Sequence, residues 1–296
     1  MAIFPLWIID AFYCLYFMKN STPEVSIVLP VYNGEKFLRI SIESCQKQTL
    51  TNWELLVIDD GSTDKSAEIV KEYAKQDARI RYYKNEVNLK LPRTLNRGFS
   101  LAKGNYLTWT SDDNYYYPQA LEKMVNALKE HQSEFAFAEC SIINEEGKEI
   151  STITAPSDYK HAIWDYDFVG ACFMYSRKVY ETIGEYDPDL FLCEDYDYWL
   201  RIFSKFPVTY IDEQLYAYRR HDKALSVTHK NGQYEALEKV LLKNFKTKEN
   251  PITLDKFYLY RGLHRSRSLR TSWIEKYEYF PVLLCYKVWH KCFCKE

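Results

Sequence analysis

Between residues 25 and 110, short apolar runs alternate with segments of helical periodicity. The run Val25–Leu29, closed by Pro30, has the continuous apolar character of a parallel strand covered on both faces. Ser62 or Thr63 can cap the helix expected to run to about residue 75. Further strands are expected at 53–58, 80–83 and 106–110, and helices at 37–45, about 62–75 and 92–104. This alternation predicts an α/β fold with a doubly wound, mostly parallel sheet.

The composition indicates a globular protein and argues against one class of partner. The chain has 296 residues, of which 47% are hydrophobic and 27% charged, enough for one principal core. The formal net charge of −2 provides no field that would recruit nucleic acid, so we expect no nucleic-acid partner. Four cysteines lie in apolar stretches, as buried reduced thiols of a cytosolic protein do: Cys45, Cys140, Cys172 and Cys193.

The first 22 residues include an apolar segment of uncertain status. The run 2–18 is short for a membrane span, carries Asp10 near its middle and lacks the basic start of a signal peptide. A transmembrane anchor is therefore the less favoured interpretation. A non-native extension and a peripheral helix both fit the segment.

Two pairs of acids directly follow two of the expected strands. Asp59 and Asp60 come after 53–58, and Asp112 and Asp113 come after 106–110. The carboxyl ends of strands border the ligand site of a doubly wound sheet, so these four carboxylates should converge there. Clustered carboxylates repel one another unless a cation or a hydrogen-bonding ligand takes up their charge. Asp is also a common turn and cap residue, but two pairs at strand ends favour a binding site.

The turn after the first strand argues against dinucleotide binding. A Rossmann oxidoreductase holds pyrophosphate on a glycine-rich turn after this strand. Residues 30–34 contain only one glycine, Gly34.

Four short motifs together resemble family 2 glycosyltransferases, which have the A-type nucleotide-sugar fold. The motifs are VSIVLPVYNGE at 25–35, VIDDGSTD at 57–64, TSDD at 110–113 and CEDYDYWLR at 193–201. Each is weak alone, but their order and spacing over about residues 24–225 are specific. The resemblance implies an inverting enzyme in which a Rossmann-like nucleotide-binding half is fused to an acceptor half.

The resemblance also implies roles in the nucleotide-binding half. Tyr32 corresponds to the residue that stacks on the nucleobase, with Pro30 beside it. Asp60 corresponds to the acid that hydrogen-bonds a uracil edge, which favours UDP, while Asp59 supports the loop. The expected nucleotide-sugar site is completed by Asn33, Glu35, Lys90 and Asp112, the last of these near the ribose or donor sugar.

A divalent cation, Mn²⁺ or Mg²⁺, is the implied cofactor. The family pattern Asp-x-Asp is replaced by Ser111-Asp112-Asp113, so the metal contact is expected at Asp113. A carboxylate with diphosphate oxygens and water is a hard-oxygen environment suited to these ions. His221 follows a predicted strand at Leu215 and corresponds to a residue that reaches the diphosphate or metal in related enzymes. A plain surface histidine is equally compatible with the sequence.

The best candidates for a general base lie in the run 194–197. If residues 194–203 form a helix, Glu194, Asp197 and Arg201 share one face, a spacing that often indicates a surface ion-pair ladder. The resemblance favours Asp195 as the base, with Glu194 and Trp199 near the acceptor or donor sugar. One carboxylate suffices for direct displacement with inversion, and general-base help is worth roughly 10²- to 10⁴-fold.

The run 168–175 resembles the acceptor-side strand of the family. Its small pair, Gly170 and Ala171, would let the backbone approach a sugar closely.

The C-terminal part differs in character from the rest. An amphipathic helix is expected at 234–245, and a basic stretch at 261–270 precedes Trp273 and the apolar run 279–286. This pattern suits a peripheral membrane-surface segment and equally a helix packed on the body. The predicted organisation is an apolar segment at 1–22, a nucleotide-sugar-binding half at 23–115, an acceptor-binding and catalytic half at 116–228, and a C-terminal helical extension at 229–296.

The leading hypothesis is an inverting glycosyltransferase of surface polysaccharide synthesis. It would take a nucleotide-sugar donor from the cytoplasm and act on a saccharide or lipid-linked acceptor at the inner face of the membrane. A polyprenyl-phosphate glycosyltransferase is an alternative, but it would normally need more membrane-spanning sequence. A nucleotide-sugar-binding scaffold without catalysis is a third, disfavoured because a binder has no use for a base such as Asp195.

Overall fold

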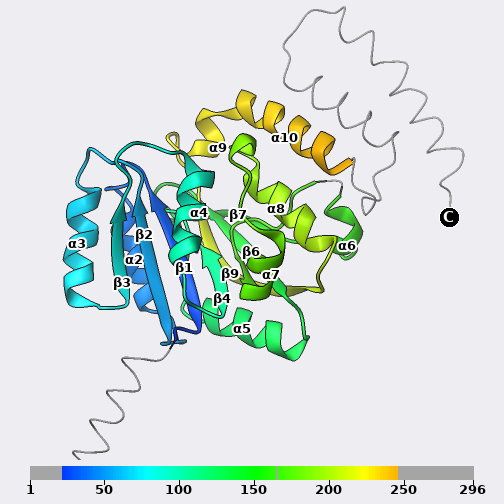
Figure 1. The fold of residues 1–296 in the computed structure, drawn as a ribbon, viewed down its shortest axis with the longest axis horizontal. Coiled ribbons are helices and arrows are strands. Elements are labelled where there is room, and N and C mark those ends of the chain that lie inside the picture. The colour runs from blue at the N-terminus through cyan, green and yellow to red at the C-terminus, as the bar shows by residue number, and fades with distance from the viewer. Residues whose placement is uncertain (1–21, 165, 246–296) are drawn as a thin grey trace, which may run out of the picture.

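The computed structural model describes residues 22–164 and 166–245. Its strands form one sheet in the order β3-β2-β1-β4-β8-β6-β9-β5, with β7 paired to β6 (Figure 1). The strands are β1 (Val25–Val31), β2 (Trp53–Asp59), β3 (Ile80–Lys84), β4 (Tyr106–Trp109), β5 (Tyr115–Tyr116), β6 (Phe135–Ile143), β7 (Glu149–Ile153), β8 (Phe173–Ser176) and β9 (Val208–Arg219).

The part predicted to bind the nucleotide-sugar, 23–115, supplies the four parallel strands β3-β2-β1-β4. Val25 lies opposite Trp53 on one side and Tyr106 on the other, so three strands start in step and end at the same edge. β1 and β2 are buried almost throughout because helices cover both faces. The doubly wound sheet is thus confirmed, and each of these four strands starts at the residue predicted.

The part predicted to bind the acceptor, 116–228, continues the same sheet with mixed pairing. β8 runs antiparallel between β4 and β6, whereas β6 and β9 run parallel. β5 pairs antiparallel with the end of β9, with Tyr115 opposite Ala217. This pairing brings the loop after β4 beside the end of β9. Because one sheet runs through 23–115 and 116–228, the division between these halves stays a functional prediction.

Helices cover both faces of the sheet, and each face has its own apolar core (Figure 1). One face is covered by α2 (Leu38–Gln46), α3 (Ser66–Gln76) and α5 (Ala120–Glu130). The other face is covered by α4 (Leu91–Leu101), α7 (Arg177–Ile183), α8 (Glu194–Phe203) and α10 (Lys230–Phe245). The short elements are α6 (Tyr159–Ala162), a 3₁₀ turn at Pro188–Leu190 and α9 (Leu225–Thr228). Gly98 lets α4 approach the sheet, because a Cβ there would lie 2.3 Å from Cγ1 of Val28.

The start of α3 corrects one expectation. The helix begins at Ser66 and receives no side-chain cap from Ser62 or Thr63. Both residues belong to the preceding loop, where their backbone N–H groups bind Asp59 Oδ1 (2.7 Å) and Asn33 Oδ1 (2.9 Å). The cap position was predicted from residue type, whereas neighbouring loops decide which partners the N–H groups find.

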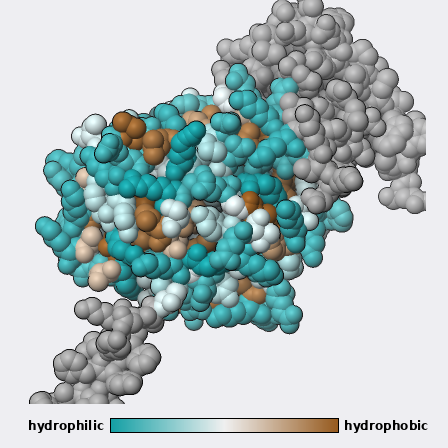
Figure 2. Space-filling view, in the orientation of Figure 1, coloured by the Kyte–Doolittle hydropathy of each residue, from teal (hydrophilic) through white to brown (hydrophobic). Residues whose placement is uncertain are grey.

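The molecular face in Figure 2 is mainly hydrophilic, with small separate apolar areas. Among the described residues, no helix combines the length and apolar character that crossing a membrane requires. Cys45, Cys140 and Cys172 are free and buried, as predicted, and Cys193 is half-buried. The predictions for the apolar N-terminal run and for the basic and apolar stretch at 261–286 lie outside the described residues.

Candidate active site

A cavity of about 1660 Å³ opens where β1, β2 and β4 end. One side, the sheet wall, is formed by residues of the loops 30–37, 60–65, 88–91 and 111–114. The other, the α8 wall, is formed by residues within 170–171, 191–195 and 218–229, together with Gln233. All predicted site residues except Trp199 line this cavity: Pro30, Tyr32, Asn33, Glu35, Asp60, Lys90, Asp112, Asp113, Gly170, Ala171, Glu194, Asp195 and His221. The fold therefore brings both sets of motifs to one place.

Hydrogen bonds join the loop after β1 to the loop after β2. The Asn33 N–H donates to Ser62 Oγ (3.0 Å), and Asn33 Oδ1 accepts the N–H of Thr63 (2.9 Å). Glu35 Oε2 accepts the N–H of Lys65 (3.0 Å). In this structure the side chains of Asn33 and Glu35 thus organise the sheet wall, and their direct contact with a nucleotide stays a prediction.

Asp60 holds the loop before α4. Its Oδ1 accepts Asn85 Nδ2 (2.7 Å) and the N–H of Leu89 (2.8 Å), while Oδ2 accepts the N–H of Lys90 (3.0 Å). Lys90 is held at φ 71°, a conformation that is unfavourable for a side chain with a Cβ. A carboxylate has about four acceptor positions, so about one is left for a ligand such as a uracil N–H.

Tyr32 presents an open ring at the rim of the sheet wall. The residue is 52% exposed, and Pro30 lies two residues before it at the end of β1. The Tyr32 N–H is hydrogen-bonded to Asp112. The same carboxylate explains Gly34, because a Cβ at that position would lie 2.0 Å from Asp112 Oδ2.

The loop after β4 carries the predicted metal ligand, and the β9–α9 loop brings His221 to it. His221 Nε2 lies 3.0 Å from Asp113 Oδ2, and this hydrogen bond raises the pKa of His221. Asp113 Oδ1 is buried and has no hydrogen-bond partner within the described part of the chain. Burial, together with the neighbouring Asp113 charge, raises the pKa of Asp112 to about 8. The two predicted metal-binding residues are therefore adjacent.

The α8 wall also carries acids with raised pKa values. Glu194 is 3% exposed, and its Oε2 has no hydrogen-bond partner among the described residues. Burial and the Asp195 charge raise the pKa of Glu194 to about 8, and burial also raises the pKa of Asp195. Desolvation and the nearby Asp195 charge raise the pKa of Asp167. Glu194 therefore favours holding a proton at neutral pH.

Asp197 belongs to a structural ion-pair network. It is fully buried, and it accepts Arg201 Nε (2.9 Å) and Lys243 Nζ (3.0 Å), with Asn244 Nδ2 on the other oxygen (3.1 Å). The network joins α8 to α10. The predicted helix over 194–203 is confirmed, and the ion-pair alternative holds for Asp197 and Arg201.

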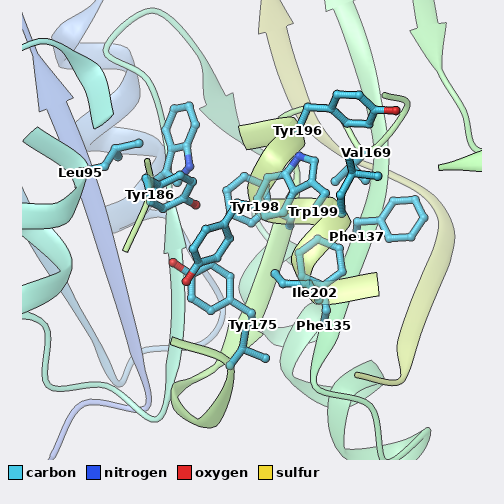
Figure 3. Packing of buried hydrophobic residues seen from close by; sticks show 14 of the residues in the cluster. Leu95, Phe135, Phe137, Val169, Tyr175, Tyr186, Tyr196, Tyr198, Trp199 and Ile202 are labelled. Carbon is cyan, nitrogen blue, oxygen red and sulfur yellow. The ribbon is translucent and has the colours of Figure 1, made fainter. Parts of the chain in front are cut away.

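Trp199 is a correction to the predicted site. It is 0% exposed and lies inside the aromatic core, with ring centroids 4.4 Å from Phe173 and 5.1 Å from Phe135 (Figure 3). Seven of the ten residues of α8 are buried, and Trp199 is among those that pack on the sheet and do not line the cavity, so its ring is not placed to contact a sugar there.

Gly170 and Ala171 line the cavity but do not lie in a strand. They form a turn before β8, with Gly170 at φ 67°. Only the end of the predicted strand at 168–175 pairs with the sheet, starting at Phe173. The positive φ favours glycine at this turn.

Sequence reasoning missed three residues of this region. Arg219 contacts the Asp113 loop, Leu192 lines the cavity at φ 84°, and Asp167 lies within reach of the Asp195 charge. Arg219 had a usable signal, because it follows buried Leu215 and Ala217 at the two-residue period of a strand. No sequence pattern marks Asp167 or Leu192.

Comparison with known proteins supplies a family. The model described as "Glycosyl transferase family 2" matches residues 26–184. An uncharacterized glycosyltransferase of Rickettsia typhi is 30% identical over 246 residues, which cover 78% of this chain and 76% of that protein. An uncharacterized glycosyltransferase of Methanocaldococcus jannaschii is 32% identical over 224 residues, covering 72% and 77%.

Solved structures of similar fold have nucleotide-sugars bound. S. aureus TarS 1-349 in complex with UDP-GlcNAc matches with a TM-score of 0.65 at 16% identity, covering 88% of this chain and 79% of that chain. The mannosyltransferase PcManGT from Pyrobaculum calidifontis, in complex with GDP-Man and Mn²⁺, matches with a TM-score of 0.63 at 12% identity, covering 98% and 95%. At these identities the likeness shows the fold alone.

Proposed function

Because the chain belongs to glycosyl transferase family 2, we propose that it transfers a sugar, with inversion, from a nucleotide-diphosphate sugar to a hydroxyl of a saccharide or lipid-linked acceptor. The observation that carries this proposal is a single cavity in which each wall has a carboxylate oxygen without a hydrogen-bond partner among the described residues. Asp113 Oδ1 and Glu194 Oε2 are buried oxygens that lack hydrogen-bond partners among the described residues. A buried oxygen without a hydrogen bond lowers the stability of the folded protein unless a ligand binds it.

The sheet wall would hold the donor. Tyr32 would stack on the nucleobase beside Pro30, and Asp112 would bind the ribose or donor sugar. Lys90 has an exposed side chain at the cavity, where its charge would face the diphosphate. UDP is the favoured nucleotide, and the UDP-GlcNAc bound to structurally similar TarS supports this choice.

Asp113 and His221 would hold a divalent cation, Mn²⁺ or Mg²⁺. The unpartnered Asp113 Oδ1 and the nearby His221 nitrogen fit such an ion, but no described group of three or more His, Cys, Asp or Glu side chains has metal-binding geometry. Diphosphate oxygens and water would therefore complete the coordination. When bound, the ion stabilises negative charge on the leaving diphosphate. The Mn²⁺ in the PcManGT complex supports this assignment.

The α8 wall would activate the acceptor. Asp195 would take the proton of the acceptor hydroxyl while that oxygen bonds to the anomeric carbon and the bond to the diphosphate breaks. The Tyr196 N–H donates to Asp195 Oδ1 (2.7 Å), which favours the charged form needed for a base. Glu194, with its pKa raised to about 8 by burial and the Asp195 charge, would be neutral and could donate a hydrogen bond to a sugar hydroxyl. Gly170 and Ala171 would leave room for that sugar.

We place this reaction in surface polysaccharide synthesis. The donor would come from the cytoplasm, and a lipid-linked acceptor would be presented at the inner face of the membrane. The basic and apolar stretch at 261–286 is the candidate for a peripheral membrane contact.

Titration calorimetry with UDP-GlcNAc, UDP-glucose, UDP-galactose and GDP-mannose, each with and without Mn²⁺, tests the proposal. We expect one UDP-sugar to bind more tightly with Mn²⁺ and to be hydrolysed slowly without an acceptor. Asp113→Asn should lose the Mn²⁺-dependent part of the affinity, because the amide lacks the charge that holds the cation. Binding without hydrolysis or transfer would indicate a scaffold, and failure to bind any nucleotide-sugar would refute the proposal.

A further inference from the structure

Arg219, the last residue of β9, is a buried cation without a carboxylate partner among the described residues. It is 4% exposed, and its side chain donates to three main-chain carbonyl oxygens. Nε lies 3.0 Å from Asp113 O, and Nη1 lies 3.2 Å from Asn144 O and 2.7 Å from Glu145 O. Buried charges are usually paired because desolvation is costly. An unpaired guanidinium at this place therefore needs an explanation beyond general stability.

The strand register explains how Arg219 reaches the loop after β4. Tyr115 pairs with Ala217 and Tyr116 with Tyr216. Continuing this antiparallel register by two residues places Asp113 opposite Arg219. The Arg219 N–H donates to Asn114 Oδ1 (2.7 Å) in this continuation, although the ladder itself has ended. Main chain and side chain of Arg219 thus bind consecutive residues of the loop.

The neighbouring contacts fix the loop in one orientation. Asn114 is buried, and its Nδ2 donates to Ser111 Oγ (3.0 Å), which closes the turn around Asp113. The Asp113 carbonyl is held by Arg219, while the Asp113 carboxylate keeps one free oxygen and has the other beside His221. The backbone of the predicted ligand is therefore fixed, and its side chain stays available.

The same guanidinium contacts the other elements around this point. It lies over the Phe37 ring, 4.5 Å from the centroid, and that ring lies 5.4 Å from the His221 ring. Its bonds to Asn144 and Glu145 tie in the turn between β6 and β7. A guanidinium can make these contacts at once because its donors lie in a fixed plane, whereas a lysine has a single ammonium.

We infer that Arg219 is a positioning residue for the cation: it sets the direction of the Asp113 carboxylate and the place of His221 through the loop backbone and Phe37. This inference rests on the proposed function, because it concerns the cation assigned to Asp113. Residues that orient a metal ligand without touching the ion typically change metal affinity 10- to 100-fold when replaced.

The test compares Arg219→Lys and Arg219→Met with a matched control. Arg177, at the start of α7, also binds carbonyl oxygens, with Nε 2.9 Å from Gly104 O and Nη2 3.0 Å from Ala102 O, but it lies at the opposite end of β4. Calorimetry with UDP-GlcNAc gives the ratio of donor affinities with and without Mn²⁺, electron paramagnetic resonance gives free Mn²⁺, and thermal unfolding gives stability. UDP-GlcNAc is used as the probe for all variants.

We expect Arg219→Lys to fold, to bind the donor without Mn²⁺ like the wild type, and to lose about tenfold or more of the Mn²⁺-dependent enhancement. Arg177→Met should lower the melting temperature and keep the enhancement. An unchanged enhancement in Arg219→Lys, or an equal loss in Arg177→Met, would overturn the inference while the proposed function stands. A wild type without Mn²⁺-dependent donor binding would refute the proposed metal role and this inference with it. If Arg219→Met does not fold, the Mn²⁺-dependent enhancement measured for Arg219→Lys decides between these outcomes.

Discussion

The acids at the end of β2 and the acids of the α8 wall differ in how much of their hydrogen-bonding capacity the protein itself uses. At the end of β2, Asp59 accepts the Ser62 N–H (2.7 Å) and the Tyr82 hydroxyl (2.6 Å), and Asp60 accepts three donors from Asn85 and the loop before α4. On the α8 wall, Glu194 has a buried oxygen without a partner among the described residues, and burial raises the pKa of both Glu194 and Asp195.

This difference separates acids that build the site from acids that are available for chemistry. Donors around a carboxylate stabilise its charged form and immobilise the loops that provide them. A carboxylate in a site with few donors binds protons more readily, which suits proton transfer near neutral pH. We therefore expect changes on the sheet wall to reduce stability or donor affinity and changes on the α8 wall to reduce turnover.

The largest effect is expected for Asp195→Asn, which preserves shape but cannot accept a proton at neutral pH. Turnover should fall by two or more orders of magnitude while donor and Mn²⁺ affinity stay near wild type. Steady-state rates and calorimetry measure the two quantities separately. Asp197→Asn, two residues along α8, is the control: it should lower stability through the α10 network and retain most activity. The reverse pattern would make Asp197 the base.

The next effect is expected on stability, for Asp60→Ala. Removing a carboxylate that accepts three donors, including the N–H groups of Leu89 and Lys90, should lower the free energy of unfolding by about 3 kcal/mol. Urea titration followed by circular dichroism measures it. Asp195→Ala should lower the free energy of unfolding much less, because among the described residues the Asp195 side chain accepts only the neighbouring Tyr196 N–H. Equal losses for both would remove the distinction between the walls.

A smaller effect is expected for Tyr32→Ala, which tests a ligand contact of the sheet wall. A ring stacked on a base contributes roughly 1 to 3 kcal/mol, so donor affinity should weaken accordingly. The melting temperature should stay close to wild type because Tyr32 is half exposed. A large fall in melting temperature would instead show that the ring supports the fold.

The last effect is expected for Glu194→Gln, and it lies in the pH dependence of stability. Burial and the Asp195 charge raise the pKa of Glu194 to about 8 from 4.5. The folded state then keeps a proton that the unfolded state releases, so this contribution to stability is full below about pH 4.5 and is lost as the pH rises through about 8. Glutamine has no proton to lose. The variant should therefore gain in melting temperature relative to wild type between about pH 5 and 9, and parallel curves would contradict the raised pKa.

Local sequence patterns determined the framework of this protein. The starts of β1 to β4 and the bounds of α8 follow from apolar runs and helical spacing, because each of these patterns lies within a single element. The convergence of Asp60 and Asp113 at one cavity also follows from the sequence, since the carboxyl ends of adjacent parallel strands meet at one edge.

Tertiary packing alone decided which side chains remain free at that edge. Asp195 and Asp197 are two residues apart on one helix, but Asp197 is neutralised by Lys243, 46 residues away, and Trp199 is taken into the core. Arg219 contacts Asp113, 106 residues away in the sequence, because β5 pairs with β9, and the sequence of neither strand predicts this pairing. The free energy of a charged or aromatic side chain depends on the atoms that surround it after folding, and those atoms come from distant segments whose approach is set by the packing of the whole sheet.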